Sequence, residues 1–400
     1  MTERIEESFE RSVDLLSRAA TTHGFVASPS FDHYAAIWGR DASIACLGAL
    51  ATGRPDLVRT AAATLDTLSA HASPLGQIPA VMIPARGEWD FGEGGVVDTT
   101  AWFVIAVGRY LGVTGDAERT RTWWPAVQNA ITWLGYQDVT GSGLVSAAPS
   151  TDWMDAALTR SGRTLHLNAL YVWAVRSGEQ IACELGEAWT VGGDELADRF
   201  DAWFWPRRDL DPATLYPHGF AHDATRIGYW EAATPARTHY LSHIVHAAFV
   251  ETCDVLANLM AVAAGIPDAG RAALILESLE PSADPFPTRT FPQPIGIGDG
   301  SGMLISTAEA SIPHRWRNRP GAYHNGAAWP YIGGFHAEAA ARHLGRDAAT
   351  ALLDRVAAAN ALGDWSFPEW IDADGLPAGA SHQTWNAATF VLGFRALGEV

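Results

Sequence analysis

Apolar residues recur every three or four positions along most of the 400-residue chain. This spacing is typical of helices that bury one face, and the Ala and Leu that dominate these segments favour helix. Alternating runs of β-branched residues are scarce, so the pattern does not favour an extensive sheet. The predicted helices span residues 44–51, 57–71, 100–111, 123–135, 165–185, 195–203, 240–264 and 337–344.

Turns of one kind separate several of these helices. An apolar segment runs into a glycine, an aspartate follows within three residues, and another apolar segment begins. Glycine ends helices in the left-handed conformation, and aspartate caps the start of the next helix. Recurring helix pairs of this kind predict stacked helical hairpins. Four such turns occupy residues 53–56, 115–116, 265–268 and 345–347.

Long segments rich in Gly, Pro and Trp interrupt the helical pattern. They span residues 73–97, 140–151, 205–235, 281–319 and 364–382. Loops of this length are uncommon in compact domains unless they carry function. We therefore expect an all-α fold, a closed double ring of helices whose loops gather around a cleft at one end. No linker of disordered composition divides the chain, which predicts a single catalytic domain over residues 1–400.

Charge and cysteine content narrow the classes of function. The formal net charge of −18 disfavours nucleic acid and anionic membranes as partners. Three scattered cysteines without CxxC spacing predict reduced thiols, and the acidic N-terminus lacks an apolar signal core. No apolar run reaches the length needed to cross a membrane. The expectation is a cytoplasmic protein.

Tryptophan supplies the first indication of chemistry. The chain has 17 Trp residues, many of them beside carboxylates. Indole faces stack on the apolar faces of pyranose rings, and a few polar groups then hold the hydroxyls. This pairing occurs in the segments Trp38-Gly39-Arg40-Asp41, Trp89-Asp90-Phe91-Gly92-Glu93, Asp152-Trp153-Met154-Asp155 and Trp365-Ser366-Phe367-Pro368-Glu369-Trp370. The segments together predict an enzyme that processes carbohydrate.

The order of these motifs resembles that of the six-hairpin glycosidases, with bacterial amylo-α-1,6-glucosidase-type proteins and neutral/alkaline invertases as the most similar groups. Further motifs extend the match, namely Val97-Asp98-Thr99, Tyr323-His324-Asn325-Gly326, Trp329-Pro330 and Gln383-Thr384-Trp385-Asn386. The resemblance covers the chain from about Trp38 onward. It implies an (α/α)6 barrel that hydrolyses a glycosidic bond with inversion, with Asp155 as general acid and Glu369 as general base.

Inverting hydrolysis needs two carboxyls on opposite faces of the sugar, roughly 6.5–9.5 Å apart, so that a water fits between one of them and the anomeric carbon. One carboxyl must be held protonated and the other ionised. On a helical turn Asp152 and Asp155 would share a face and raise each other's pKa, so Asp152 is an alternative acid. Asp152 could instead cap a helix after Ser150-Thr151.

The matched motifs also imply a set of substrate-binding residues. Arg40 and Asp41 are expected as a pair that holds sugar hydroxyls, or else as an ion pair at a helix start. His324 is expected to donate a hydrogen bond and Trp329 to stack on the sugar ring. The full set is Trp38, Arg40, Asp41, Phe91, Glu93, Asp98, Asp152, Trp153, His324, Asn325, Trp329, Trp370, Gln383 and Trp385.

The expected substrate is a small α-linked glucoside or oligosaccharide attacked from its end. The segment around Phe91 favours the sucrose-cleaving invertases, whereas the motifs at Tyr323 and Glu369 favour the debranching-type proteins. The chain has no room for the separate transferase domain of full debranching enzymes, which favours a small substrate over glycogen. No cofactor is expected.

The sequence also allows two other functions and contains two motifs that we discount. A sugar epimerase on the same barrel would use His324 or the histidines at 239, 243 and 246, and an inactive sugar-binding protein would not respond to mutation of Glu369. The three histidines are spaced i, i+4 and i+7, which would place them on one helical face, but no HExxH motif accompanies them and two-carboxyl hydrolysis needs no metal. The glycine-rich run 296–302 lacks the Gly-Lys-Ser/Thr of a phosphate loop.

Overall fold

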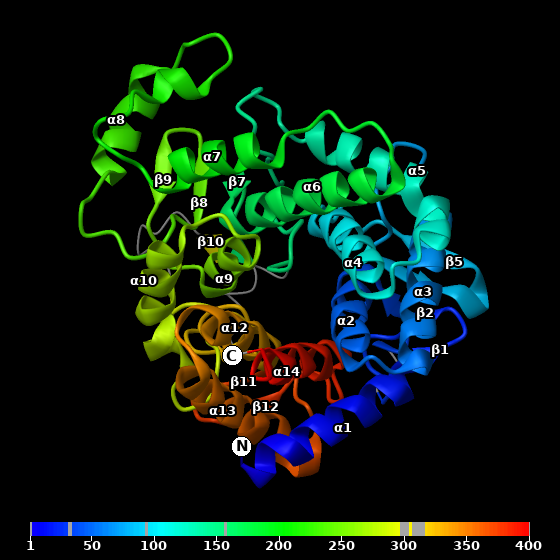
Figure 1. Ribbon diagram of the computed structural model, residues 1–400. Coiled ribbons are helices and arrows are strands. Elements are labelled where there is room, and N and C mark those ends of the chain that lie inside the picture. Colours follow the sequence, from blue (N-terminus) through cyan, green and yellow to red (C-terminus); the bar gives the residue numbers. More distant parts are fainter. Residues whose placement is uncertain are drawn as a thin grey trace.

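The computed structural model describes residues 2–30, 34–92, 95–155, 158–296, 304–305 and 317–399. Its helices are α1 (Glu3–Ala19), α2 (Gly39–Thr52), α3 (Pro55–Ala70), α4 (Asp98–Thr114), α5 (Ala117–Gly135), α6 (Leu165–Leu185), α7 (Gly193–Phe204), α8 (Asp223–Ala232), α9 (Val255–Ala263), α10 (Ala269–Leu279), α12 (Pro330–His343), α13 (Arg346–Trp365) and α14 (Thr384–Ala396). Figure 1 shows them wound around a central axis.

Two concentric rings of helices make up the fold. The inner helices α2, α4, α6, α9, α12 and α14 each pack against the next, and α14 packs back against α2. Helices α1, α3, α5, α7, α10 and α13 lie outside them, each contacting one or two inner helices. The expected closed double ring is confirmed as an (α/α)6 barrel (Figure 1).

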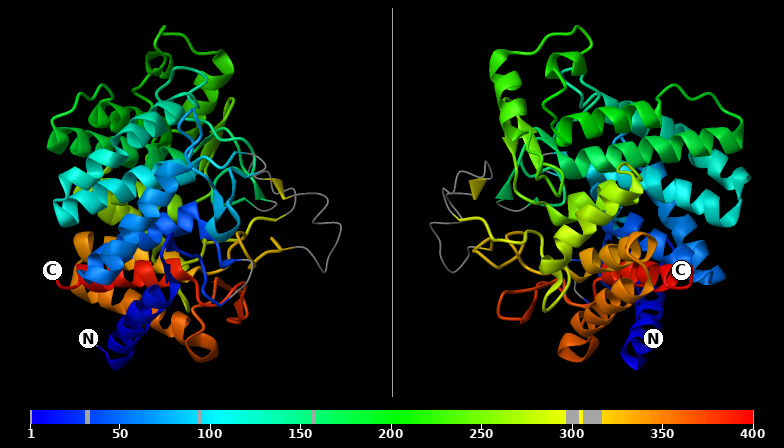
Figure 2. Two further views of the ribbon diagram at one scale, coloured as in Figure 1. Left: turned by 90° about the vertical axis from the view of Figure 1, so that its right-hand side faces the viewer. Right: turned by 60° about the vertical axis from the view of Figure 1, so that its left-hand side comes forward.

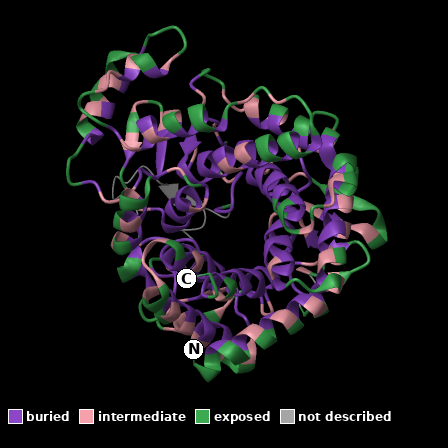
Figure 3. Ribbon diagram, viewed as in Figure 1, coloured by how far each residue is buried: buried purple, intermediate pink, exposed green. Residues whose placement is uncertain are grey.

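Burial explains which helices lie inside. Helix α9 has the sequence Val-Leu-Ala-Asn-Leu-Met-Ala-Val-Ala, and all its residues through Val262 are buried. The outer helix α1 buries one stripe that includes Ile5, Leu15 and Leu16, and it exposes Glu and Arg on the other side. Figure 3 shows this contrast, with buried residues around the inner ring and exposed ones on the rim.

Small residues set the closest contacts of the inner ring. A Cβ at Gly48 on α2 would lie 2.4 Å from the Cα of Ala388 on α14, and one at Gly334 on α12 would lie 2.5 Å from Thr389. Any larger side chain at either glycine would push α14 away from its neighbour. Helix α14 therefore closes the ring through glycine contacts on both sides.

The strands form small sheets outside the rings. Their members are β1 (Ala20–Thr21) with β2 (Gly24–Phe25), β3 (Ile37–Trp38) with β4 (Val81–Ile83) and β5 (Glu88–Asp90), β6 (Leu158–Thr159) with β10 (Leu304–Ile305), β7 (Arg163–Thr164) with β8 (His243–Val245) and β9 (Ala248–Val250), and β11 (Trp370–Ile371) with β12 (Pro377–Ala378). All of the paired strands are antiparallel. Figure 2 shows most of the connecting loops on one side of the barrel.

The sequence predictions of secondary structure were wrong in several segments. The helix predicted over 240–264 forms only as α9, because the stretch before it contains β-branched and aromatic residues that build the β8–β9 hairpin. Asp254 then starts α9, since its Oδ1 accepts the backbone N–H of Ala257 at 3.0 Å. The loop predicted over 205–235 contains α8, and the segments 73–97 and 364–382 contain short strands.

Candidate active site

The N-terminal ends of the inner helices meet at the loop-bearing end of the barrel. Arg40 lies in the first turn of α2, Asp98 starts α4, and His166 lies in the first turn of α6. Trp329 and Gln383 occupy the positions just before α12 and α14. Helix N-termini present unpaired N–H groups and favour negative charge nearby. This end therefore suits a cluster of carboxylates.

A buried ion pair joins the first three inner helices. Asp98 accepts hydrogen bonds from Nε and Nη2 of Arg40 at 2.8 and 3.0 Å, and Nε2 of His166 lies 3.4 Å from its Oδ2. Burial would raise the pKa of Asp98, but Arg40 and His166 lower it to about 2. The expected pairing of Arg40 with Asp41 is therefore corrected, because the guanidinium forms its two-bond contact with Asp98 instead.

Asp41 is a buried carboxyl that is only partly ionised at neutral pH. Its side chain is 5% exposed. Burial raises its pKa to about 7, the charges of Glu369 and Asp155 add to this effect, and Arg40 opposes it. A protonated Asp41 can donate a hydrogen bond as well as accept one.

Asp155 and Asp152 have different environments. Both oxygens of Asp152 have partners, because Oδ1 accepts the backbone N–H of Met154 and Oδ2 pairs with Arg160. The segment is a turn and not a helix, so Asp152 caps a turn. Arg160 also pairs with Asp254, which places Asp152 in a closed buried network.

Asp155 lies at the mouth of the site with 43% of its side chain exposed. Its Oδ2 is 3.9 Å from Nη1 of Arg40. The surrounding protein still displaces much of its water, and this loss of solvation raises its pKa to about 6 against the opposing effect of Arg40. The charges of Asp98 and Asp152 contribute to this rise. Asp155 thus combines access with a raised pKa.

Glu369 is held in a fixed orientation just before β11. Its Oε2 accepts the backbone N–H of Ala380 at 2.9 Å, and its Oε1 accepts from Oη of Tyr34 at 3.4 Å. The carboxyl is 7% exposed. Burial raises its pKa, an effect that Ala380 and Tyr34 oppose and the charge of Asp155 increases. Glu369 and Asp155 therefore share one electrostatic environment.

Gly379 makes the position of Glu369 possible. Its φ is +75°, and a Cβ there would lie 2.3 Å from Oε2 of Glu369. We expect Gly379→Ala to displace the carboxylate and lower kcat by about 10²-fold, since misplacement of a catalytic group by about 1 Å has that effect. Gly375 is the matched control, because its φ is +80° and a Cβ would contact only Phe286, at 3.6 Å.

Steady-state kinetics of the two variants tests this expectation. Both variants carry left-handed backbone strain, which lowers the stability of each, and Gly379→Ala should lose more because it adds the contact with Glu369. Only Gly379→Ala should lose kcat. Equal kcat values for Gly379→Ala and Gly375→Ala would show that the contact with Glu369 does not position it.

Two tyrosines near the carboxyls were not predicted. Tyr34 is close enough to Glu369, Asp41 and Asp155 for their charges to raise its pKa, after the larger effect of burial. Tyr323 has a φ of +48° and stacks on His324 at 4.0 Å. Its pKa is also raised by burial and by Asp155 and Glu369. The aromatic and acidic run just before Trp38 could have indicated Tyr34.

The tryptophans of the motifs divide into buried and accessible ones. Trp153 and Trp329 are 2% and 1% exposed, and their rings meet edge to face at 5.5 Å. A ring buried to this degree cannot stack on a substrate, so in this arrangement Trp329 is part of the core on which the site rests. Trp38 and Trp370 are half-buried, as is Phe91, so these three remain partly accessible to a substrate. Trp385 is 6% exposed and stacks on Tyr331 at 4.2 Å.

The polar residues predicted to bind substrate also differ in their environments. Asn325 is fully buried and uses its amide to bind the backbone of Ile295 and Asn318, so its role is to fold the loop. His324 is buried, and burial, followed by the nearby arginines, holds its pKa well below the usual value. Within the described residues, neither Nδ1 of His324 nor the amide of Gln383 has a hydrogen-bond partner. Such orphaned groups commonly bind a ligand or water.

Several other predicted features lie elsewhere. Glu93 and most of the glycine-rich run 296–302 fall outside the described residues. The histidines at 239, 243 and 246 lie on and before the β8–β9 hairpin, so they do not share a helical face. Over the described ranges, no three His, Cys, Asp or Glu side chains form a group that could hold a metal ion. None of the helices in those ranges is long and apolar enough to cross a membrane.

Solved structures with this fold include carbohydrate enzymes. A family GH63 mannosylglycerate hydrolase from Thermus thermophilus, in complex with Tris and D-glycerate, superposes with a TM-score of 0.66 at 16% identity, covering 96% of this chain and 99% of that one. Its complex with glucose gives 0.64 at 16%, with the same coverage. A GH78 rhamnosidase from a Bacillus species gives 0.63 at 18%, covering 98% of this chain and 34% of that one.

At these identities, the structural likeness supports the fold alone. A comparison with curated proteins finds no match. The model of the family described as amylo-alpha-1,6-glucosidase matches residues 10–259, more than half of the chain and the part that contains Arg40, Asp98 and Asp155. With carboxylates and indoles at the helix N-termini of an (α/α)6 barrel, this match shows that the chain is a glycoside hydrolase and belongs to the amylo-α-1,6-glucosidase family.

Proposed function

We propose that the protein is an inverting glycosidase that removes a terminal glucose from a small α-linked glucoside. The observation that carries the proposal is the pairing of two carboxyls with different supports in one site. Glu369 is oriented by Ala380 and Tyr34, which favour its ionised form. Asp155 stands near Arg40 at the mouth of the site with its pKa raised to about 6. These are the requirements for a base and an acid.

In the proposed reaction, Glu369 removes a proton from water while the water oxygen bonds to the anomeric carbon. Asp155 gives its proton to the glycosidic oxygen, and the bond between that oxygen and the anomeric carbon breaks. Charge builds on the sugar ring in an oxocarbenium-like transition state. The proton gained by Glu369 and the one lost by Asp155 are exchanged with solvent. Asp41 and the Gln383 amide lie at the same end of the barrel and are proposed to bind the sugar hydroxyls.

The pH dependence follows from the two carboxyls. Asp155 acts when protonated, so kcat/KM should fall as pH rises above about 6. Glu369 acts when ionised, so activity should also fall on the acid side, at a pH above the ordinary value for glutamate because its pKa is raised. Initial rates across roughly pH 4–9 should therefore give a bell-shaped profile. A profile that stays flat above about pH 6 would remove Asp155 from the acid role.

A second substrate class has specific support. The charge of Arg317 acts on Glu369, Tyr323 and His324, so this cation lies near the site. A guanidinium there could bind a leaving group that carries a carboxylate. The mannosylglycerate hydrolase named above was solved with D-glycerate. A glucoside of a small hydroxy acid is therefore the second candidate.

Glucose release from a panel of substrates tests both candidates. The panel contains sucrose, isomaltose, panose, maltose and glucosylglycerate, each at equal concentration. Release from one of the four neutral sugars supports the first candidate, and release from glucosylglycerate alone supports the second. Interconversion of free sugars without hydrolysis would contradict both and support the epimerase interpretation.

A further inference from the structure

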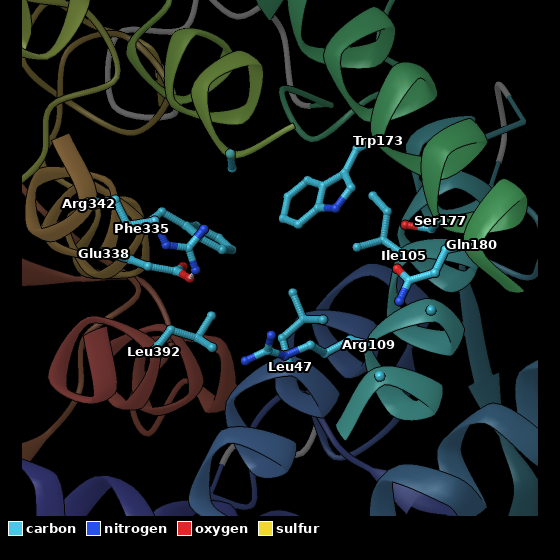
Figure 4. Close-up of a pocket in the computed structure, with 13 residues that line it drawn as sticks. Leu47, Ile105, Arg109, Trp173, Ser177, Gln180, Phe335, Glu338, Arg342 and Leu392 are labelled. Carbon is cyan, nitrogen blue, oxygen red and sulfur yellow. Dashed lines mark hydrogen bonds and ion pairs between the residues drawn. The ribbon is translucent and has the colours of Figure 1, made fainter. Parts of the chain in front are cut away.

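A second cavity lies at the end of the barrel opposite the carboxylates. It has a volume of about 410 Å³ and is lined by residues from all six inner helices. The lining comes from their middle and C-terminal turns, for example Leu47 on α2, Ser177 on α6 and Leu392 on α14. Figure 4 shows these side chains pointing toward a common space. Cavities of roughly 300–1,000 Å³ are the usual size of small-molecule sites.

Aromatic rings separate this cavity from the active site. Phe335, which lines the cavity, stacks on Trp102 at 6.0 Å, and Trp102 meets Trp173 edge to face at 5.9 Å. Tyr331 lies between Phe335 and Trp385 of the active-site end, at centroid distances of 6.5 and 4.2 Å. Trp102 is 1% exposed and Phe335 3%. The two sites are thus separate spaces at opposite ends of one packed core.

The cavity has a positive balance of charge in a strongly acidic protein. Nη2 of Arg342 donates to Oε1 of Glu338 at 2.6 Å, which pairs these two charges. Arg109 also points into the space (Figure 4), and its charge reaches Glu338, but within the described residues it forms no hydrogen bond or ion pair. Two guanidiniums therefore face one carboxylate. An anionic group bound by Arg109 would neutralise the remaining positive charge of the cavity.

The other residues that line the cavity favour a small ligand with hydroxyl groups. Trp173 is half-buried and presents its indole to the space, and Ser177 and Gln180 offer a hydroxyl and an amide on the adjacent turns of α6 (Figure 4). Indole faces pack on sugar rings, while hydroxyl and amide groups bind their hydroxyls. Gly112 leaves room beside Gln180, since a Cβ there would meet only its Nε2, at 3.8 Å.

We propose that this cavity is a second, non-catalytic binding site for an anionic monosaccharide, a hexose that carries one phosphate or one carboxylate. Arg109 binds the anionic group, Trp173 packs against the ring, and Ser177 with Gln180 binds hydroxyls. The proposal is independent of the reaction assigned to Asp155 and Glu369.

Isothermal titration with glucose 6-phosphate and with glucuronate tests the proposal, and the two probes distinguish phosphate from carboxylate. At least one should bind the wild type and Glu369→Gln with equal affinity. Arg109→Gln should weaken that binding about tenfold or more, the usual effect of losing a charged hydrogen bond. The matched control is Arg59→Gln, an exposed arginine on the outer helix α3 that should leave binding unchanged.

A cavity-filling variant gives a second, independent readout. Gly112→Leu places a side chain in the space and improves helix propensity, so the protein should fold, keep kcat/KM and lose the probe. Failure of both probes to bind would overturn the proposal. Equal affinity of the probe for the wild type and for Arg109→Gln would also overturn it. So would an equal weakening of probe binding by Arg59→Gln, or tight binding of glucose by itself and of inorganic phosphate by itself.

Discussion

Glu369→Gln is expected to lower kcat by about 10²- to 10⁴-fold and leave KM nearly unchanged, because it removes general-base catalysis without removing a sugar contact. The exchange keeps the side-chain shape. The amide oxygen can still accept the N–H of Ala380, which now binds Oε2 at 2.9 Å. Stability should therefore change little. Steady-state kinetics on the best substrate of the panel measures the effect, with thermal unfolding as the check on folding.

Asp374→Asn is the control for the loss of a charge in this region. Asp374 lies in the exposed turn between β11 and β12, five residues after Glu369. Its variant should keep full activity. Near-normal kcat in Glu369→Gln would exclude this carboxylate as the base, whereas a large rise of KM at constant kcat would assign it to binding alone.

Asp155→Asn is expected to lower kcat by a similar factor on substrates whose leaving group needs a proton. The effect should be far smaller on α-glucosyl fluoride, because fluoride departs without protonation. The acid limb of the pH profile should remain and the limb above about pH 6 should disappear. Kinetics is measured side by side on the glucoside and on α-glucosyl fluoride. A variant that lacks only the general acid loses activity on the glucoside alone, whereas an unfolded variant loses activity on both.

Asp152→Asn is the matched comparison three residues away. Asp152 pairs with the buried Arg160, which also pairs with Asp254, so its exchange should lower the free energy of unfolding. Any loss of activity in Asp152→Asn should be of similar size on the glucoside and on α-glucosyl fluoride. If Asp152→Asn and not Asp155→Asn were rescued by the fluoride, the two aspartates would exchange roles.

The ring of helices was predictable because its cause is local. Helices place apolar residues every three or four positions, which the sequence displays directly, and the segment predicted as 165–185 is helix α6 with the same bounds. Asp116 and Asp268 cap α5 and α10 as their turns indicated, each through a side-chain oxygen. The failure over 240–264 came from tertiary context, since β8 pairs with β7, a strand some 80 residues earlier in the chain.

The structure brings several of the residues named from the sequence to one end of the barrel, although their pairings differ from the predicted ones. Asp155, Glu369 and Asp41 meet at one end because inner helices and their preceding loops share that end. Sequence adjacency suggested Arg40 with Asp41, but neighbouring residues on a helix point in different directions, and Arg40 reaches Asp98 on the next helix. The contact of Tyr34 with Glu369 joins residues 335 positions apart, and no local pattern indicates it.

Proton NMR of the anomeric region, recorded from the first minutes after enzyme is added to the hydrolysed α-glucoside, tests the central claim most directly. Inversion by Glu369 and Asp155 predicts that β-glucose appears first and then mutarotates. If α-glucose appeared first, the reaction would retain configuration, one carboxylate would act as a nucleophile, and the roles assigned to this pair would be contradicted.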